Sequence, residues 1–306
     1  MEHIYDMIII GGGPSGYTAA LYATRAGFDT LVIEKISPGG QMALTGVIDN
    51  YPGFDEGIEG FDLGMKMMQQ AERFGAKTEY AEVVSVAFED KIKTVETTGG
   101  IYRGKTIIIA TGAKARELGV PKEKEYIGRG VHYCAHCDGR FYKDKTVVVV
   151  GGGNSAAADA LYLSRLAKKV IIIHRRDKLR ATRIYHEPLM NCDNVEFHWN
   201  SKVSEILADG LVKGVKIVDV ISGEENTLQC DGIFVSIGRI PISEFVKSQI
   251  DIDDNGYIIA DETTRTNIEG VFAVGDVRTK ALRQIITAAA DGAVAVHYAE
   301  EYILKE

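Results

Sequence analysis

One sequence pattern occurs twice in this chain at a constant offset, and this repeat dictates the fold class. An apolar strand runs into a glycine-rich turn at Gly11–Gly16 and again at Gly151–Ala156. A helical stretch and a second apolar strand follow each turn, and the second strand leads to Glu34 in one copy and to His174 in the other. Each copy is therefore predicted to form a βαβ unit of a parallel sheet. The offset is too long for a solenoid, so the pattern predicts two similar α/β units.

Similar material follows each copy, whereas the last part of the chain does not repeat. Short β-branched runs separated by turns occupy residues 78–109 and 195–235, which predicts further strands in both units. The unrepeated part contains Gly275-Asp276 and a helical stretch over residues 283–302. The simplest topology inserts the second unit into the first and lets the tail complete the first.

This topology predicts two Rossmann-like, three-layer ββα dinucleotide-binding domains, one inserted into the other. The predicted ranges are 1–114 and 244–306 for the first domain and 115–243 for the inserted domain. The chain must then cross between domains near residues 113–118 and 239–245, which are candidate hinges.

Length and composition are those of a globular protein. The chain has 306 residues, about two domains' worth, and its formal charge of −8 argues against a nucleic-acid-binding protein with a basic face. No apolar run approaches the roughly 20 residues that a membrane-spanning helix needs. The N-terminus lacks the basic region of a secretory signal. We therefore expect a soluble, cytoplasmic protein, and its four cysteines do not make a disulfide framework.

The two glycine-rich turns predict two dinucleotide sites. The first glycine of such a turn allows the tight bend, the second lets a pyrophosphate approach the backbone, and the third position lets helix and strand pack closely. The following helix offers free N–H groups to the phosphates. The first site is predicted to contain Gly11, Gly13, Pro14, Ser15 and Gly16, and the second Gly151, Gly153, Asn154, Ser155 and Ala156.

The residue after the second strand distinguishes the two sites. Glu34 can accept a hydrogen bond from a ribose 2′-hydroxyl and would repel a 2′-phosphate. The second copy instead has His174, Arg175 and Arg176, with Arg180 nearby, and guanidinium groups match a phosphate dianion. We therefore predict an adenine dinucleotide without a 2′-phosphate in the first unit and NADP(H) in the second. The alternative for the arginines is a solvated basic turn.

Two dinucleotides in one chain indicate electron transfer between a nicotinamide and a flavin. Gly275-Asp276 follows an apolar run, and a glycine-flanked acid in this position can bind a ribityl hydroxyl. The other interpretation of Asp276 is an N-cap for the terminal helix, and the two roles are compatible.

Cys134 and Cys137 form a Cys-x-x-Cys motif just ahead of the second unit's first strand. In an α/β protein of this kind the motif indicates redox chemistry. Zinc is the rival interpretation, with His132 and His136 as further ligands, but structural zinc usually needs four ligands. A third interpretation is a pair of inert buried thiols. We predict no metal.

Thiol chemistry needs a thiolate and a proton source. Asp138 can protonate a departing thiolate, and protonated His132 or His136 would favour the thiolate. The alternatives are a turn role for Asp138 before Gly139 and solvent exposure for both histidines. Cys192 and Cys230 are interpreted as structural.

Together these motifs resemble the bacterial low-molecular-weight, FAD-containing thioredoxin reductases over nearly the whole chain. The matching motifs are Gly11–Gly16, Gly39–Gln41, Asn50–Gly53, Ala110–Ala113, Cys134–Gly139, Gly151–Ala156, His174–Arg180, Gly275-Asp276 and Arg283-Gln284. Most are weak singly, but their joint order is highly specific.

The resemblance implies a homodimer that passes electrons from NADPH through FAD to the Cys134–Cys137 disulfide and on to thioredoxin. It implies that Cys137 faces the flavin, that Cys134 exchanges with the partner, and that one domain rotates between two arrangements. Beyond the residues of the first turn, the implied FAD site contains Gly40, Gln41, Asn50, Ala110, Thr111, Gly112, Gly275, Asp276, Arg283, Gln284 and Ile285.

Some positions depart from the family pattern. Ala158 stands where an acid is usual, His132 replaces a small polar residue, His136 replaces Thr or Val, and Arg140 replaces a small or aromatic residue. These changes bear on thiol pKa and partner choice more than on the fold.

Three other functions compete with NADPH-dependent thioredoxin reduction. A ferredoxin-dependent relative would not need Arg175, Arg176 and Arg180, and a nucleotide-sensing protein would not need the Cys-x-x-Cys motif. A peroxiredoxin reductase would need an additional N-terminal redox domain, for which the motif at Gly11 leaves no room.

Overall fold

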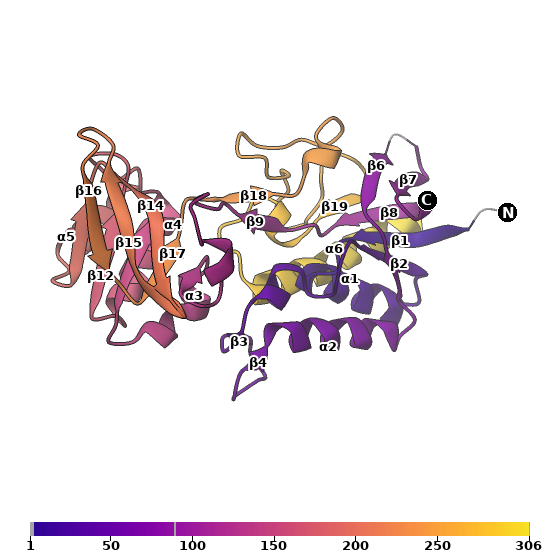
Figure 1. The fold of residues 1–306 in the computed structure, drawn as a ribbon. Coiled ribbons are helices and arrows are strands. Elements are labelled where there is room, and N and C mark those ends of the chain that lie inside the picture. Colours follow the sequence, from indigo (N-terminus) through magenta and orange to yellow (C-terminus); the bar gives the residue numbers. More distant parts are fainter. Residues whose placement is uncertain (1–2, 89, 306) are drawn as a thin grey trace. The chain divides into compact units, whose positions relative to one another are not determined.

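A computed structural model describes residues 3–88 and 90–305 and divides them into two compact units (Figure 1). Unit 1 comprises the described residues up to Lys114 and from Ile240 onward, and unit 2 is Ala115–Arg239. The two connecting segments pair with each other as the short strands β9 (Ala113–Ala115) and β18 (Arg239–Pro241). The second boundary lies a few residues before the predicted one, because the Ile242 N–H donates to the Gly112 carbonyl (3.0 Å) of unit 1.

Unit 1 is built on a seven-stranded sheet. Its parallel strands are β5 (Lys77–Tyr80), β2 (Thr30–Glu34), β1 (Ile4–Ile10), β8 (Gly100–Ile109) and β19 (Val271–Ala273). The antiparallel strands β7 (Lys93–Thr97) and β6 (Val83–Ala87) continue from the first half of β8. Its helices are α1 (Pro14–Arg25), α2 (Gly60–Glu72) and α6 (Ile285–Lys305), and β3 (Val47–Ile48) with β4 (Ile58–Glu59) forms a separate hairpin.

Unit 2 repeats this plan with a five-stranded parallel sheet and a separate three-stranded antiparallel sheet. The parallel strands are β10 (Val131–His132), β17 (Gly232–Val235), β11 (Thr146–Val150), β12 (Lys169–Ile173) and β13 (Val195–His198). The antiparallel strands are β14 (Ser201–Asp209), β15 (Leu211–Asp219) and β16 (Glu225–Gln229). The helices are α3 (Ala135–Asp138), α4 (Asn154–Ser164) and α5 (His186–Met190).

The apolar first strands of the two repeats are buried on both faces. In β1, Met7 and Ile9 pack in a cluster with residues of α1 and α6, whereas Ile8 and Ile10 pack with residues of β6 and β7. In β11 the odd-numbered valines pack against α4, and the even-numbered ones pack against β15. Because strand side chains alternate in direction, the part of a strand that lies between two layers must be apolar at successive positions, as it is over residues 7–10 and 147–150. Each unit is therefore a three-layer ββα structure, as predicted.

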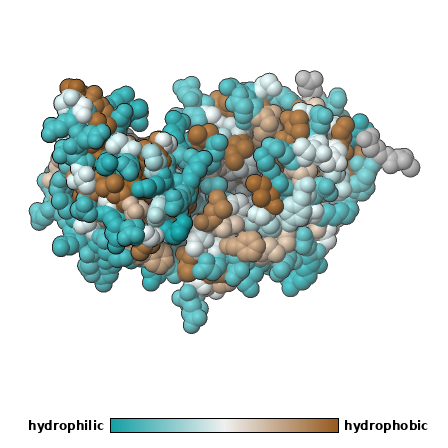
Figure 2. Space-filling model, viewed as in Figure 1, coloured by the Kyte–Doolittle hydropathy of each residue, from teal (hydrophilic) through white to brown (hydrophobic). Residues whose placement is uncertain are grey.

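Element boundaries differ from the predicted ones at the helices. The helix after the first turn begins at Pro14, where proline is favoured because the N–H of the first helical residue has no intrahelical acceptor. The terminal helix begins at Ile285, so its N-cap position is Gln284 and not Asp276. Among the residues described, no helix combines the length and apolar character needed to cross a membrane. On the face drawn in Figure 2, apolar side chains lie among polar ones, as is usual for protein surfaces.

Candidate functional site

The glycine-rich turn of unit 1 leaves open space at the position where a pyrophosphate is expected. Gly11 has a φ of 109°, and a Cβ there would lie 2.5 Å from the Ala110 carbonyl oxygen. A Cβ on Gly16 would collide with the Gly11 carbonyl. A Cβ on Gly13, in contrast, would meet nothing within 4 Å. Packing inside the protein explains the first and third glycines, while the second borders empty space that a phosphate group fits.

Glu34 lies at the edge of this turn with both carboxylate oxygens held. Its Oε2 accepts a hydrogen bond from the Gly12 N–H (2.7 Å), and its Oε1 accepts one from the Ile36 N–H (2.9 Å). A carboxylate oxygen has more than one lone pair, so this residue can still accept a ribose hydroxyl. The predicted pairing of the turn with Glu34 is present in the structure.

Distant segments meet at the same turn. The Gly39 N–H donates to the Gly12 carbonyl (2.8 Å), and a Cβ on Gly40 would lie 3.7 Å from Gly13 Cα. A Cβ on Gly275 would lie 2.7 Å from Ser15 Oγ. The candidate FAD residues at positions 11–16, 34, 40 and 275 are therefore gathered around one turn.

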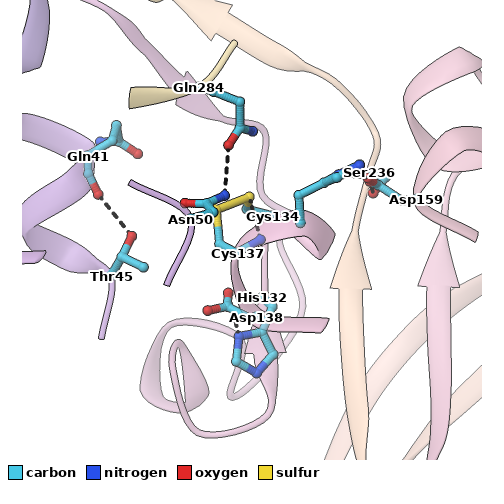
Figure 3. The surroundings of a disulfide bond; sticks show 11 residues. Gln41, Thr45, Asn50, His132, Cys134, Cys137, Asp138, Asp159, Ser236 and Gln284 are labelled. Carbon is cyan, nitrogen blue, oxygen red and sulfur yellow. Dashed lines mark hydrogen bonds and ion pairs between the residues drawn. A yellow bond between two sulfur atoms is a disulfide. The ribbon is translucent and has the colours of Figure 1, made fainter. Parts of the chain in front are cut away.

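Other predicted FAD residues of unit 1 are held by polar contacts. Asn50 Nδ2 donates to Gln284 Oε1 (3.1 Å), as Figure 3 shows. Arg283 donates to the Arg278 carbonyl (3.1 Å), and its guanidinium lies 4.0 Å from the centroid of the Tyr257 ring. Thr111 Oγ1 donates to the Ile242 carbonyl (2.6 Å).

A buried ion cluster behind Gly275 was not found from the sequence. Asp291 accepts hydrogen bonds from the Gly275 N–H (2.8 Å), from Arg278 Nε and Nη2 (both 2.9 Å) and from Lys280 Nζ (2.7 Å). Arg278 is 2% exposed and Asp291 is 6% exposed. Burial raises the pKa of Asp291, but the hydrogen bonds from Arg278 and Lys280 outweigh it, and the net effect lowers that pKa. The cluster holds the backbone that carries Asp276.

The glycine-rich turn of unit 2 has the same backbone packing as that of unit 1, but a histidine takes the place of the glutamate beside it. A Cβ on Gly151 would collide with the Ser236 carbonyl, whereas one on Gly153 would meet nothing within 4 Å. The ring of His174 lies against Gly152, just as Glu34 lies against Gly12. Position 174 is therefore spatially equivalent to position 34, as the repeat predicted.

Arginines surround the equivalent position in unit 2. The Arg180 N–H donates to the Gly152 carbonyl (2.7 Å), and the exposed side chains of Arg175, Arg176 and Arg180 border this turn. Burial, and then the positive charges of Arg180, Arg176 and Arg175, lower the pKa of His174. Its buried Nε2 has no hydrogen-bond partner. Asn154 holds the same loop, because its Oδ1 accepts the Thr182 N–H (2.8 Å).

Cys134 and Cys137 are bonded to each other, with their Cα atoms 5.3 Å apart. Cys134 caps α3, and its Sγ accepts the Cys137 N–H (3.2 Å), a contact that would stabilise a Cys134 thiolate. Both cysteines are partly exposed, so the interpretation as inert buried thiols is wrong. Within residues 3–88 and 90–305, no group of three or more His, Cys, Asp or Glu side chains could hold a metal.

The two histidines of this segment have different environments. His132 is 8% exposed, and its Nδ1 lies 2.9 Å from Asp138 Oδ2, so solvent exposure is wrong for this residue. His136 is about half exposed, with Nδ1 3.8 Å from Asp159 Oδ1, while Asp159 is also hydrogen-bonded by Ser236. Burial raises the pKa of Asp159.

The other two cysteines do not join this site. Burial raises the pKa of Cys230 to about 12, so this thiol stays protonated. Cys192 is partly exposed, and its thiol donates to the Pro188 carbonyl (3.2 Å).

Comparisons with known proteins match the whole construction. Residues 5–292 match the family described as pyridine nucleotide-disulphide oxidoreductase. The chain is 49% identical to a thioredoxin reductase of Listeria monocytogenes, with 100% of this chain and 96% of the relative covered. It is 46% identical to a thioredoxin reductase of Bacillus subtilis, with 99% and 96% covered. The chain belongs to the thioredoxin reductases of this family.

The solved structures agree with this family assignment. The thioredoxin reductase from Streptococcus pyogenes superimposes with a TM-score of 0.93 at 45% identity and covers 100% of both chains. Thioredoxin reductases of this family are flavoproteins that use FAD and NADPH. The open space at Gly13 with Glu34, and the open space at Gly153 with the arginines, fit these two dinucleotides.

Proposed function

We propose that this protein reduces oxidised thioredoxin with electrons from NADPH, which pass through FAD and the Cys134–Cys137 disulfide. The observation that carries the proposal is this disulfide in the same unit as the arginine-bordered turn. Relatives named thioredoxin reductase match the chain over nearly their whole lengths. Unit 1 is the proposed FAD domain, and unit 2 is the proposed NADPH domain.

The FAD site of unit 1 is proposed to use backbone for the phosphates and side chains for the sugar parts. The turn at Gly13 faces the pyrophosphate, Glu34 accepts the ribose hydroxyl, and Asp276 binds the ribityl chain. Bound FAD would supply the two-electron redox chemistry that connects the nicotinamide with the disulfide. Asp291 acts behind the site, since it holds the Gly275 N–H at 2.8 Å.

Glu34→Arg should release FAD. The substitution replaces an acceptor with a cation and removes the hydrogen bond to the Gly12 N–H. The flavin-to-protein absorbance ratio after purification measures the loss. Glu34→Gln is the matched control, because it keeps an acceptor oxygen and should retain more flavin. A fully yellow Glu34→Arg protein would contradict the ribose role.

Replacing both Arg175 and Arg176 with alanine should raise KM for NADPH far more than KM for NADH. Two charge-assisted contacts at about 1.5–3 kcal/mol each predict that the preference for NADPH over NADH falls by at least about 10²-fold. Steady-state kinetics with both donors measure the ratio. Lys178→Ala removes a charge from the same turn without a guanidinium group, and it should change the ratio little. An unchanged ratio in the double variant would refute a 2′-phosphate role.

The two sulfurs have different proposed roles in thiol–disulfide exchange. The Cys134 thiolate attacks the disulfide of the partner and forms a mixed disulfide. Cys137, the flavin-facing sulfur, then attacks Cys134 and releases the reduced partner. Asp138, which follows Cys137 in α3, protonates the departing thiolate.

Three further points of the proposal concern the setting of the protein. The partner is thioredoxin or a thioredoxin-like protein, the active form is a homodimer, and the location is the cytoplasm. The location is supported by the chemistry, because a reductant of disulfides works against the oxidised state of secretory compartments. Light scattering after size-exclusion chromatography tests the dimer.

An anaerobic titration of bound flavin tests the whole function. NADPH, NADH and reduced ferredoxin are compared as donors, and oxidised thioredoxin is then added. Bleaching of the flavin by NADPH, reversed by thioredoxin, is the expected result. Bleaching by ferredoxin alone would support the ferredoxin-dependent alternative, and a protein without flavin would refute the flavoenzyme.

A further inference from the structure

His132 is a buried histidine whose two ring nitrogens both have partners close to the disulfide. It ends β10, and its Nδ1 lies 2.9 Å from Asp138 Oδ2 while its Nε2 lies 2.7 Å from the Tyr142 hydroxyl. Figure 3 shows the imidazole and the Asp138 carboxyl facing each other beneath Cys137. The chain therefore links the proposed proton donor to a second titratable group.

Packing holds the imidazole in one orientation. The ring stacks on Phe234 with centroids 5.3 Å apart and meets the Tyr142 ring edge-on with centroids 5.2 Å apart. His132 is 8% exposed, which separates it from bulk water. A side chain locked in this way can orient its hydrogen-bonded neighbour.

We propose that His132 is a positioning residue for Asp138, and that the two side chains together hold the proton used in thiol–disulfide exchange. The inference rests on the proposed function, in which Asp138 protonates a departing thiolate. His132 acts through Asp138 and is not assigned any contact with sulfur or flavin.

The proton count of the exchange requires a group that gives and regains protons. At the start, Cys134 is a thiolate, Cys137 is a thiol, and the Asp138–His132 pair holds one proton. Attack by Cys134 breaks the disulfide of the partner, and the departing sulfur takes the proton of the pair. The pair then takes the proton of Cys137, whose sulfur attacks Cys134 and breaks the mixed disulfide. The second departing sulfur takes that proton, which leaves a reduced partner and an oxidised Cys134–Cys137 pair.

The hydrogen bonds of His132 suit both proton states of the pair. Without the extra proton, the two distances allow the tautomer in which Nδ1–H donates to the Asp138 carboxylate and Nε2 accepts from the Tyr142 hydroxyl. With it, an imidazolium donates through both nitrogens. Burial, followed by the charge of Asp138, raises the pKa of Tyr142, so its hydroxyl keeps its proton in either state.

Three more titratable groups act on Tyr142. They are the buried thiol of Cys230, the carboxyl of Asp231 and the ammonium of Lys145, which is 5.3 Å from the centroid of the Tyr142 ring. The Cys230 thiol stays protonated, and the Asp138 carboxyl, 2.9 Å from Nδ1, can balance a proton on His132.

His132→Asn tests the proposal, because an asparagine amide keeps a donor near Asp138 but does not titrate. In stopped-flow mixing of the reduced holoenzyme with oxidised thioredoxin, we expect an exchange rate about tenfold lower and a shifted pH profile. The rate of flavin reduction by NADPH should stay within about twofold, since that step precedes exchange. His198→Asn is the matched control, because His198 pairs with Glu196 (2.7 Å) in the same unit and should leave the pH profile unchanged.

A double-variant cycle separates positioning from a general effect on the fold. In an Asp138→Asn background, His132→Asn should cost less than about twofold, since its target is gone. An equal cost in both backgrounds, or an unchanged pH profile of His132→Asn, would overturn the proposal. Tyr142→Phe removes only the outer hydroxyl and should also shift the profile; this variant decides the question if His132→Asn does not fold.

A partner-free readout distinguishes this inference from the proposed function. The dithiothreitol-reduced holoenzyme is alkylated with iodoacetamide across pH, and His132→Asn should shift the profile of the more reactive cysteine. If His132→Asn shifts the alkylation profile but the native protein does not reduce thioredoxin, the proposed function alone is refuted. If the native protein reduces thioredoxin but His132→Asn changes neither the pH profile of exchange nor that of alkylation, the inference alone is refuted.

Discussion

Replacing Cys134 with serine should abolish NADPH-dependent thioredoxin reduction while NADPH still reduces the bound flavin. A serine hydroxyl at neutral pH does not supply the anionic nucleophile that a thiolate does, so the mixed disulfide cannot form. The glycine-rich turns lie elsewhere in the sequence and keep their geometry. Steady-state thioredoxin turnover and anaerobic flavin bleaching measure the two halves separately.

Two further cysteine variants control this result. Cys192→Ser changes a partly exposed thiol of the same unit and should leave turnover near the native rate. Cys137→Ser should also abolish turnover, because its sulfur is needed to resolve the mixed disulfide. Thioredoxin reduction that survives in Cys134→Ser would overturn the roles assigned to the two sulfurs.

Asp291→Ala should destabilise the fold by about 3–5 kcal/mol, the usual cost of leaving a buried charge without its partner. The change removes the carboxylate that pairs with Arg278, which is 2% exposed. Lys280 and the Gly275 N–H lose the same acceptor. Because Gly275 lies against Ser15, we also expect weaker FAD retention. Urea unfolding of the holoprotein and the flavin-to-protein ratio measure the two effects.

The conservative variant gives this prediction a pH signature. The lowered pKa of Asp291 means that its stabilisation is present above the pKa of the unfolded chain and is lost as pH falls through the folded value. Asp291→Asn keeps the volume and an acceptor for the Gly275 N–H but not the charge. Relative to the native protein, Asp291→Asn should lose less unfolding free energy at low pH than at neutral pH. At low pH the loss should also be smaller than that of Asp291→Ala. Equal stability of native protein and Asp291→Ala at neutral pH would contradict the role of the cluster.

The repeat made the fold predictable because its physical consequences are local. An apolar strand, a tight glycine turn and a helix follow one another in the chain, so the pattern alone reveals the βαβ unit. The same alignment places Glu34 and His174 at equivalent positions, and the structure shows both against the middle glycine of their turns. Helix starts and the boundary near Arg239 were less predictable, since backbone hydrogen bonds such as that of Ile242 decide them.

The missed parts of the site depend on contacts between distant segments. In the sequence, Asp291 resembles any other polar residue of a helix, and the residues next to it give no sign that it has a buried partner. Its partners Arg278 and Lys280 become visible only when α6 packs against the loop after β19. His132 looked as though it could be exposed, but packing against Phe234 buries it.

Residue patterns in the sequence were enough to recognise the two-unit α/β architecture, the two dinucleotide turns, the Cys134–Cys137 motif and the resemblance to thioredoxin reductases. These features are carried by residues a few positions apart, whose spacing along the backbone is the physical constraint. The folded structure was needed to show which charges are buried together and which side chains are hydrogen-bonded to each other. Burial and hydrogen bonding of Asp291 and His132 arise where different elements of the fold contact each other. Such contacts cannot be predicted from the spacing of residues along the chain.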